Sequence, residues 1–343
     1  MAVTIKDVAK AANVAPSTVS RVIADSPRIS ENTKRKVRTI MEELGYHPNF
    51  IARSLASQST QTLGIVFPNS GNISFQNPFF SEVLRGISEG VNDKHYTLQL
   101  TSGKTEDEIY NDVVNMVQGR RVDGIILLYS KKDDKVVDYL RQKKFPFVLI
   151  GKPYEDQEQI THVDNDNISA GRDGTKYLLG LGHERIGFIG GNKNLMVTAD
   201  RLAGYKKALI ENQIPIKEEY ITHDEFLLEG GQQAIKELMH LSQPPTALLV
   251  TDELMALGVL KTVHALGYNV PDNLSIISFN NALFAELATP PLTSIDINIF
   301  DLGMEAVKNL ILKLENPKEP IKRIIIPHSI IVRKSCERGS HNY

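Results

Sequence analysis

The stretch NVAPSTVSRVIADSPRIS, residues 13–30, decides how the N-terminal part of this 343-residue chain folds. Pro16 suits the first turn of a helix, and Val19, Val22 and Ile23 recur at the spacing of one helix face. The other face holds short hydroxyl side chains and one arginine, namely Ser17, Thr18, Ser20 and Arg21. We therefore predict a helix with an apolar back and a polar face that can approach another molecule closely.

One further helix is predicted before this one and another after it. Thr4 and Asp7 form a capping-box-like pair before the first helix, and Ser30 is placed to cap a third helix that ends at Gly45. The inward face of the third helix would be Val37, Ile40, Met41 and Leu44. The three patterns predict a small helical bundle built around a helix-turn-helix.

Charge is divided unevenly along the chain. Residues 1–60 carry nine Lys/Arg against five Asp/Glu, a net of +4, which leaves −6 for the rest of a chain whose formal net charge is −2. A basic head on an acidic body favours contact of the head alone with a polyanion. The third helix contributes a cationic run that by itself would be an ordinary solvated face, namely Lys34, Arg35, Lys36 and Arg38.

Composition limits the class of protein. Hydrophobic residues make up 41% and charged residues 23% of the chain, and no apolar run approaches the length needed to span a bilayer. The start MAVTIKDVAK lacks the features of a secretory signal, and the single Cys336 rules out an internal disulfide. We expect a cytoplasmic protein with two or three folding units and no membrane partner.

Residues 47–62 are expected to form a linker. Pro48 breaks the preceding helix, and Ser, Gln and Thr dominate the second half of the segment. Within it, NFIARSLA has room for about two helical turns, too few to be stable alone, so a partner would have to order them.

From residue 63 the pattern alternates between strand and helix. Short apolar runs such as LGIVFP, DGIILLY, RIGFIGG and LSIISFN are separated by amphipathic stretches, which is typical of parallel sheets covered by helices. The fold class is therefore α/β, with two doubly wound parallel-sheet subdomains. We expect the first to comprise residues 63–162 with 293–325, and the second 163–292 with 326–343.

Two facing subdomains predict a ligand-binding cleft, because ligands in such folds bind at the carboxyl ends of the strands. The late segments PLTSIDINIFDLG and IKRIIIPHSIIVR are candidates to cross between the two halves as hinge strands.

Patterns that look catalytic or metal-binding fail in context. GISEG, residues 86–90, matches a serine nucleophile elbow but lies inside a helical stretch. DNDNIS, from Asp164, starts like a calcium loop, but Ser169 and Thr175 stand where the turn glycine and the bidentate glutamate belong. No two of the nine histidines have the spacing of a helical zinc motif. We expect no enzyme activity, no metal and no cofactor.

The head sequence TIKDVAKAANVAPSTVSRVI…RISENTKRKVRTIMEELGYHPNFIARSLA resembles the DNA-binding head of the lactose repressor (LacI/GalR) family. The motifs NPFF, VDGIIL, LGHERIGFIGG, DRLAGY, TDELMALGVL and PPLTSID are similar to the family's periplasmic-binding-protein-like core. The resemblance covers essentially the full length. The segment SFNNALFAELATPPLTSID is most similar to the maltose-type repressor branch of Gram-positive bacteria.

The resemblance implies a three-helix head, residues 1–46, that places its second helix in the major groove of DNA. Pro16 and Ser17 match the main operator-discriminating positions, and Thr18, Ser20 and Arg21 lie at or near DNA. Because proline cannot hydrogen-bond a base through its side chain, Ser17 and apolar contact must carry that readout.

The resemblance also implies contacts outside the second helix. The residues that match phosphate-contacting positions are Thr4, Arg28, Ser30, Thr33, Tyr46 and Asn49. Ala52 and Leu55 match a hinge helix that forms only on operator DNA, where the leucine wedges into the minor groove. The alternative is an ordinary linker turn with Leu55 packed on the core.

In the cleft, Arg201 of DRLAGY matches the family's ligand-bonding arginine, whose planar fork suits paired sugar hydroxyls or a carboxylate; the alternative is an inter-strand salt bridge. Asp252 lies next to where relatives hydrogen-bond the effector. Asn280 stands where many relatives carry an aspartate, which favours a neutral polyol. The phenylalanines that are candidates either to stack on a sugar or to be core residues are Phe79, Phe80, Phe226 and Phe279.

Together these features predict a homodimeric transcriptional repressor of sugar-utilisation genes that binds double-stranded operator DNA and is released by a sugar effector, maltose or a maltodextrin. The lack of leucine heptads beyond residue 336 favours a dimer over a tetramer. The alternative is a co-repressor-dependent or catabolite-control type of regulator, whose ligand or phosphocarrier partner strengthens DNA binding. A sugar-transport protein would share the core but has no use for a basic head.

Overall fold

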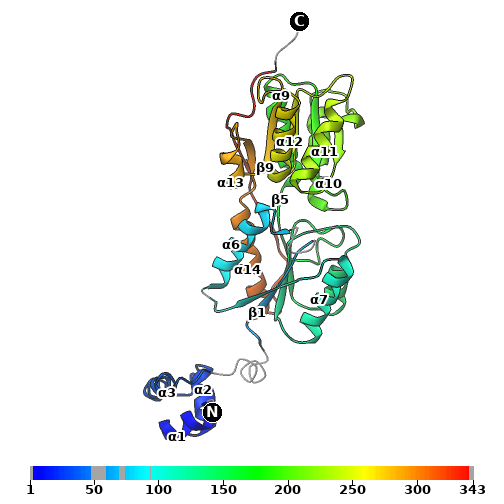
Figure 1. Ribbon diagram of the computed structural model, residues 1–343. Helices are drawn as coiled ribbons and strands as arrows, with labels where there is room; N and C mark the ends of the chain where they lie inside the picture. The colour runs from blue at the N-terminus through cyan, green and yellow to red at the C-terminus, as the bar shows by residue number, and fades with distance from the viewer. Residues whose placement is uncertain (1–2, 48–58, 69–73, 93, 340–343) are drawn as a thin grey trace. The chain divides into compact units, whose positions relative to one another are not determined.

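The computed structural model describes residues 3–47, 59–68, 74–92 and 94–339. They form two compact units divided after Gln61: a helical head and an α/β core (Figure 1). No helix among these residues has the length and apolar character needed to cross a membrane.

The head consists of α1 (Ile5–Ala12), α2 (Pro16–Ile23) and α3 (Glu31–Glu43). Asn13 ends α1 in the left-handed conformation, so a short turn leads directly to Pro16 at the start of α2. Ser30 caps α3 by accepting a hydrogen bond from the Thr33 backbone N–H at 3.3 Å. The expected helix-turn-helix and its start signals are confirmed.

The apolar faces of the three helices meet in one small core, made of Val8, Ala9, Ala12, Val19, Val22 and Val37. Leu44, which was expected to join this core, is instead 38% exposed. The reason is that α3 ends at Glu43, and Gly45 with φ +62° turns the chain away from the helix face.

The alternative of an ordinary solvated face does not hold for Lys34. Its side chain is only 7% exposed, and its Nζ lies 2.9 Å from a Glu31 oxygen and 3.1 Å from an Asp25 oxygen. These two carboxylates raise the pKa of Lys34. Arg38 contacts the same Asp25 at 2.6 Å. Lys34 therefore fastens α3 to the loop after α2, whereas Arg35 remains exposed.

The core contains two six-stranded sheets. The first has the order β11-β5-β4-β3-β1-β2 and is entirely parallel. Its strands are β1 (Thr62–Val66), β2 (Thr97–Leu100), β3 (Gly124–Leu127), β4 (Phe147–Ile150), β5 (His162–Asn165) and β11 (Arg323–Ile326).

The second sheet has the order β12-β10-β9-β8-β6-β7, and only β12 is antiparallel to its neighbour. Its strands are β6 (Ile186–Gly190), β7 (Ile221–His223), β8 (Ala247–Val250), β9 (Ser275–Asn280), β10 (Thr293–Asp296) and β12 (Ser329–Ile331). The expected α/β class with two doubly wound subdomains is confirmed.

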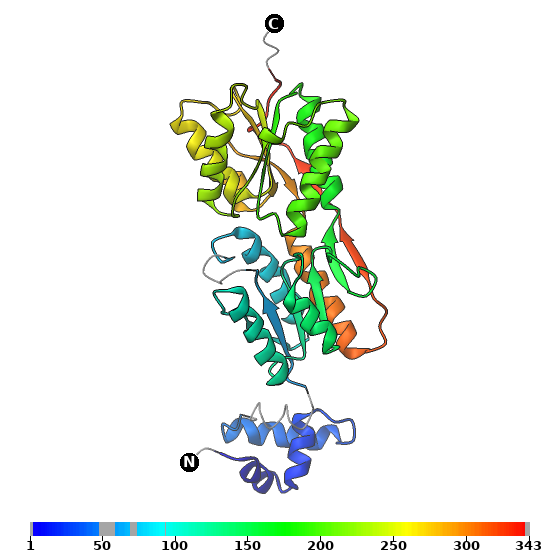
Figure 2. The ribbon, with the colours of Figure 1, turned by 90° about the vertical axis from the view of Figure 1, so that its right-hand side faces the viewer.

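Helices cover both faces of each sheet, as expected for parallel sheets (Figure 2). In the first subdomain they are α6 (Pro78–Asn92) paired with α14 (Ile299–Glu315), and α7 (Glu106–Gln118) near α8 (Lys135–Gln142). In the second they are α9 (Asn167–Gly180) paired with α10 (Met196–Glu211), and α11 (Leu228–Met239) paired with α12 (Glu253–Ala265). The short elements α13 (Leu283–Leu287) and η1 (Glu218–Tyr220) complete the second subdomain.

The first glycine of GISEG, Gly86, is explained by helix packing. Gly86 lies inside α6, and a Cβ added there would meet the Phe300 carbonyl oxygen of α14 at 2.1 Å. The motif is therefore a close crossing of two helices and not a strand-to-helix nucleophile turn.

The chain crosses between the subdomains three times: from β5 to α9, from β10 to α14, and from β11 to β12. Asn165, which is 3% exposed, stands at the first crossing. Its Nδ2 donates to the Ile297 carbonyl at 2.9 Å and to the Ile326 carbonyl at 3.0 Å. These carbonyls belong to the second and third crossings, so one side-chain amide ties all three together.

The expected subdomain boundaries need correction at two strands. Residues 163–165 of β5 pair within the first sheet, and β10 pairs within the second sheet, each opposite to the expected assignment. An apolar strand pattern does not reveal which sheet the strand joins. The two late segments do cross between the halves, as expected.

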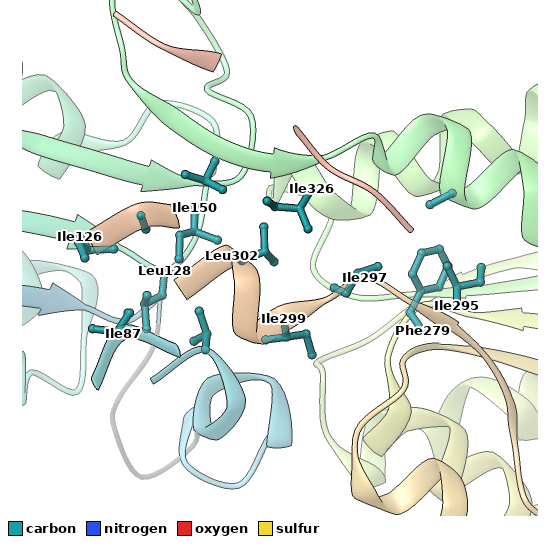
Figure 3. Packing of buried hydrophobic residues seen from close by; sticks show 14 of the residues in the cluster. Ile87, Ile126, Leu128, Ile150, Phe279, Ile295, Ile297, Ile299, Leu302 and Ile326 are labelled. Atoms are coloured by element: carbon teal, nitrogen blue, oxygen red, sulfur yellow. The ribbon is translucent and has the colours of Figure 1, made fainter. Parts of the chain in front are cut away.

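One hydrophobic core runs through the crossings. Ile297, Ile299 and Ile326 belong to the same buried cluster as Leu128 of the first subdomain and Phe279 of the second. Figure 3 shows Ile297 and Ile326 between the residues of the two sheets. The subdomains therefore do not bury their apolar residues independently of each other.

We predict that Asn165→Ala lowers the free energy of unfolding of the core by roughly 2–4 kcal/mol, because two buried carbonyl groups lose their donor. Urea unfolding followed by far-UV circular dichroism measures this change. Asn309→Ala is the control, since its amide bonds only within α14, to Glu305. Equal destabilisation by both variants would contradict the role given to Asn165.

Candidate functional site

The polar face of α2 is open to solvent. Pro16, Ser17, Ser20 and Arg21 are exposed and Thr18 is half-buried, whereas Val19 and Val22 on the other side are buried in the head core. The helix thus has the predicted apolar back, and its short side chains allow a base edge to come close.

The residues expected to contact phosphates differ in their surroundings. Arg28 and Ser30 are exposed, and Thr33 and Tyr46 are half-buried. Both the N–H and the hydroxyl of Thr4 donate to Asp7 Oδ2, at 2.9 and 2.7 Å. These bonds lower the pKa of Asp7, so a carboxylate stands directly beside Thr4.

Three candidate residues of the linker, Asn49, Ala52 and Leu55, lie outside the described residues. The alternative of Leu55 packing on the core is therefore also left open.

The core holds a cavity of about 170 Å³ between the two subdomains, at the carboxyl ends of strands of both sheets. Six of the seven candidate effector residues line it: Phe79, Phe80, Arg201, Phe226, Asp252 and Asn280.

Phe279 does not line the cavity. It is fully buried, and its ring lies under the Arg201 guanidinium, whose central carbon is 3.9 Å from the ring centroid. Adjacent residues of β9 point to opposite sides of the strand, which separates Phe279 from Asn280. Phe279 therefore supports the arginine through a cation–π contact and does not stack on a ligand.

Arg201 is buried on α10 and held by hydrogen bonds to neutral groups. Its Nε donates to Asn167 Oδ1 at 2.9 Å, and its Nη1 donates to the Thr251 carbonyl at 2.6 Å. Burial lowers the pKa of Arg201, and the carboxylates of Asp252 and Asp164 oppose that shift. Among the described residues no carboxylate pairs directly with it, so the structure gives the expected alternative of a salt bridge no support.

Asp252 organises its surroundings and has no free lone pair for a ligand. Its Oδ1 accepts from the backbone N–H groups of Leu254 and Met255 at 2.8 and 3.2 Å, which caps α12. Its Oδ2 accepts from the Asn77 and Asn280 amides at 2.9 and 3.0 Å. Burial raises the pKa of Asp252 and these hydrogen bonds oppose the shift. Two bonds to each oxygen fill its acceptor capacity.

Three aromatic rings of the cavity wall pack against neighbouring groups. The Phe226 ring lies on the Gly191 backbone, where an added Cβ would meet ring carbons at 2.2 Å. Phe79 and Phe80 pack edge to face with centroids 5.2 Å apart. Flat apolar surfaces therefore stand in the cavity wall beside polar amides.

Sequence reasoning missed several polar residues of the cavity, above all Asn77, Asp164 and Asn167. Asn167 donates to Asp164 at 3.0 Å and accepts from Arg201, so it orients the guanidinium. The signal is the polar run DNDN at the end of β5, which the sequence alone relates only to a calcium loop. Asn77 begins NPFF, a motif whose phenylalanines are more conspicuous than its amide.

A helix-turn-helix head joined to a two-subdomain core with a buried polar cavity defines a regulator of transcription. The comparisons with known proteins agree. Residues 4–49 match the family model described as bacterial regulatory proteins, lacI family, and residues 175–336 match the periplasmic binding protein-like domain.

Known relatives align over nearly the whole chain. The HTH-type transcriptional regulator MalR of Streptococcus pneumoniae is 42% identical over 96% of this chain and 99% of its own length. The chain thus belongs to the lacI family of bacterial transcriptional regulators, which are not enzymes.

Two solved structures superpose on about four-fifths of the chain. A putative transcriptional regulator LacI from Bacillus cereus subsp. cytotoxis superposes with a TM-score of 0.80 and 52% identity, over 81% of this chain and 99% of that chain. A probable maltose operon transcriptional repressor malR from Staphylococcus aureus superposes with a TM-score of 0.75 and 31% identity, over 82% of this chain and 99% of that chain.

We predict that Asp164→Asn removes part of the pH dependence of stability. Burial raises the pKa of Asp164 to about 7. The folded state therefore favours the neutral acid, and this contribution is present at low pH and lost as pH rises through about 7.

Between pH 4.5 and 7.5, the free energy of unfolding of the wild type should fall by up to about 1.4 kcal/mol per pH unit more than that of the variant. Urea unfolding at four pH values gives this difference. Glu89→Gln, which removes an exposed carboxylate of α6, controls for the change in net charge. Parallel curves for wild type and Asp164→Asn would contradict the neutral form of Asp164.

Proposed function

We propose that this regulator is a homodimeric repressor of sugar-utilisation genes, acting in the cytoplasm, and that a neutral sugar in the cleft releases it from its operator. Maltose or a maltodextrin is the effector proposed. Two heads would read the two halves of a pseudo-palindromic site, and paired hinge segments would contact its centre.

The observation that carries this proposal is that uncharged polar side chains outnumber charged ones in the lining of the cavity, and that several of the charged ones already have partners inside the protein. Lys131 pairs with Glu106 at 2.8 Å, and Asp252 is filled by four donors. Arg201 is held by neutral oxygen atoms, and the raised pKa of Asp164 favours its uncharged form. The two hydrogen bonds of Arg201 use only two of its five N–H groups, so a hydroxylated ligand can accept from the guanidinium without bringing a second charge into the cavity.

The remaining lining groups suit a polyol. Six asparagines line the cavity, namely Asn77, Asn165, Asn167, Asn192, Asn194 and Asn280. An amide both donates and accepts, as sugar hydroxyls do, and the aromatic rings of Phe79 and Phe226 offer flat surfaces to the C–H face of a sugar. The likeness to the probable maltose operon repressor supports maltose as the first sugar to test.

On DNA, α2 is proposed to enter the major groove, with Ser17 reading base edges beside Pro16 and with Thr18, Ser20 and Arg21 nearby. Phosphate contacts are proposed for Thr4, Arg28, Ser30, Thr33, Tyr46 and Asn49, and minor-groove contacts for Ala52 and Leu55. Because the Thr4 hydroxyl already donates to Asp7, Thr4 would need to change partners to donate to a phosphate.

We predict that Ser17→Ala changes operator preference at one or two bases, whereas Arg35→Ala weakens binding similarly for all sequences. The reason is that Ser17 lies on the reading face of α2, whereas Arg35 is an exposed cation of α3. Selection from a randomised operator library, followed by anisotropy titration, separates the two effects. An unchanged base preference for Ser17→Ala would contradict its reading role.

We predict that Arg201→Lys weakens sugar binding by about 10–100-fold, or roughly 1.4–2.8 kcal/mol, because lysine cannot reproduce the planar fork. Isothermal titration with maltose, maltotriose and glucose measures this loss. Arg172→Lys is the matched control, since Arg172 lies on α9 outside the cavity and pairs with Asp173.

Operator titrations with and without the sugar that binds decide the direction of regulation. Weaker operator binding supports induction, and stronger operator binding supports the co-repressor alternative. If none of the three sugars binds, the proposed effector class is wrong.

A further inference from the structure

The two subdomains touch directly along one rim of the cleft, where the loop after β3 meets the loop before α10. The Lys132 N–H donates to the Asn194 carbonyl at 3.1 Å, and the Met196 N–H donates to the Ser130 carbonyl at 2.9 Å. We name these four residues the rim bridge. Because each bond joins one subdomain to the other, the rim bridge exists only while the cleft is closed.

An ion pair crosses the cleft close to the rim bridge. Lys152 follows β4 of the first subdomain, and its Nζ lies 2.7 and 2.6 Å from the two carboxylate oxygens of Asp200 on α10. The two side chains are only 18% and 11% exposed. Such shielding makes the pair stronger than an exposed surface pair, because water and salt screen it less.

The ion pair and the rim bridge are linked through Ser130. The Ser130 hydroxyl donates to the Lys152 carbonyl at 2.5 Å, while the Ser130 carbonyl accepts from Met196 across the cleft. The backbone of Lys152 is thereby fixed relative to the rim. Separation of Lys152 from Asp200 and separation of the rim bridge are therefore parts of the same movement.

The surrounding charges make the closed cleft depend on Lys152. The carboxyl of Asp164 is influenced by both partners, since the Asp200 carboxylate raises its pKa and the Lys152 ammonium lowers it. Arg201 also faces Asp164, but it is held by Asn167 and Thr251. Without Lys152, the Asp200 carboxylate would remain only 11% exposed and would lose its cation, which opposes closure.

We infer that the Lys152–Asp200 ion pair holds the cleft closed when no effector is bound. Lys152 and Asp200 are then positioning residues, and a ligand enters only after the ion pair and the rim bridge separate. The inference rests on the proposed function only in taking the cavity as the effector site. Closure itself is a property of the chain and does not depend on the identity of the sugar.

The test is amide-resolved hydrogen–deuterium exchange on the full-length protein without ligand. The N–H groups of Lys132 and Met196 bond across the cleft, so their exchange rates report its opening. Lys152→Met removes the cation and keeps most of the alkyl chain. We expect exchange at both amides to rise roughly tenfold or more, with the buried amides of β8 unchanged.

Lys135→Met is the matched control, because it is the same substitution at an exposed ion pair with Asp107 inside the first subdomain. It should leave both amides unchanged. Asp200→Asn removes the charge from the other partner with almost no change of shape, and it should raise the same two rates. Unchanged rates at both amides in Lys152→Met and Asp200→Asn would overturn the inference. If Lys152→Met does not fold, the Asp200→Asn result alone decides.

A parallel maltose titration separates this inference from the proposed function. If maltose binds, its addition to the wild type should slow exchange at Lys132 and Met196, because the ligand stabilises the closed form. If maltose does not bind, the proposed effector is wrong, whereas the exchange rates of the two variants still decide whether the ion pair closes the cleft.

Discussion

The core depends on the two hydrogen bonds that the side-chain amide of Asn165 donates. Three chain crossings connect the subdomains, and this amide donates to carbonyl groups of the other two. Both N–H groups are thereby used in a buried position, where an unpaired partner is costly. Asn165 and Ile297 also line the cavity, so the crossings form part of its wall.

Next to this hinge, two opposite charges are buried without forming a direct ion pair. Arg201 is satisfied by an amide oxygen, a backbone carbonyl and the face of Phe279, and Asp252 by two amides and two backbone N–H groups. Burial of a charge is tolerated when hydrogen bonds replace those of water. Since Asn77 comes from the first subdomain and Asp252 from the second, this network also spans the cleft.

The head was predictable from its sequence because its signals are local. Pro16 at the start of α2, the Ser30 cap and the Gly45 terminus each act within one helical turn. The burial of Lys34 was not predictable, since it depends on Asp25, which another loop brings to α3. For the same reason the sequence did not reveal that β5 belongs to the first sheet and β10 to the second. It also did not reveal that Phe279 lies under Arg201.

In the cleft, the location of the polar residues was predictable from the sequence, but the role of each side chain was not. Arg201, Asp252 and Asn280 were correctly expected to lie at the cavity. Whether a carboxylate binds a ligand or orients its neighbours depends on how many of its lone pairs already accept hydrogen bonds. For Asp252 this number is known only from the structure.

The hydrogen bonds of Asp252 and Arg201 also bear on the charge of the ligand. A cationic ligand would have to displace amide donors from Asp252. Arg201 instead uses only two of its five N–H groups in its hydrogen bonds to Asn167 and Thr251. Hydroxyl oxygen atoms can accept from the guanidinium without displacing a hydrogen bond within the protein, which supports the neutral polyol that we propose as effector.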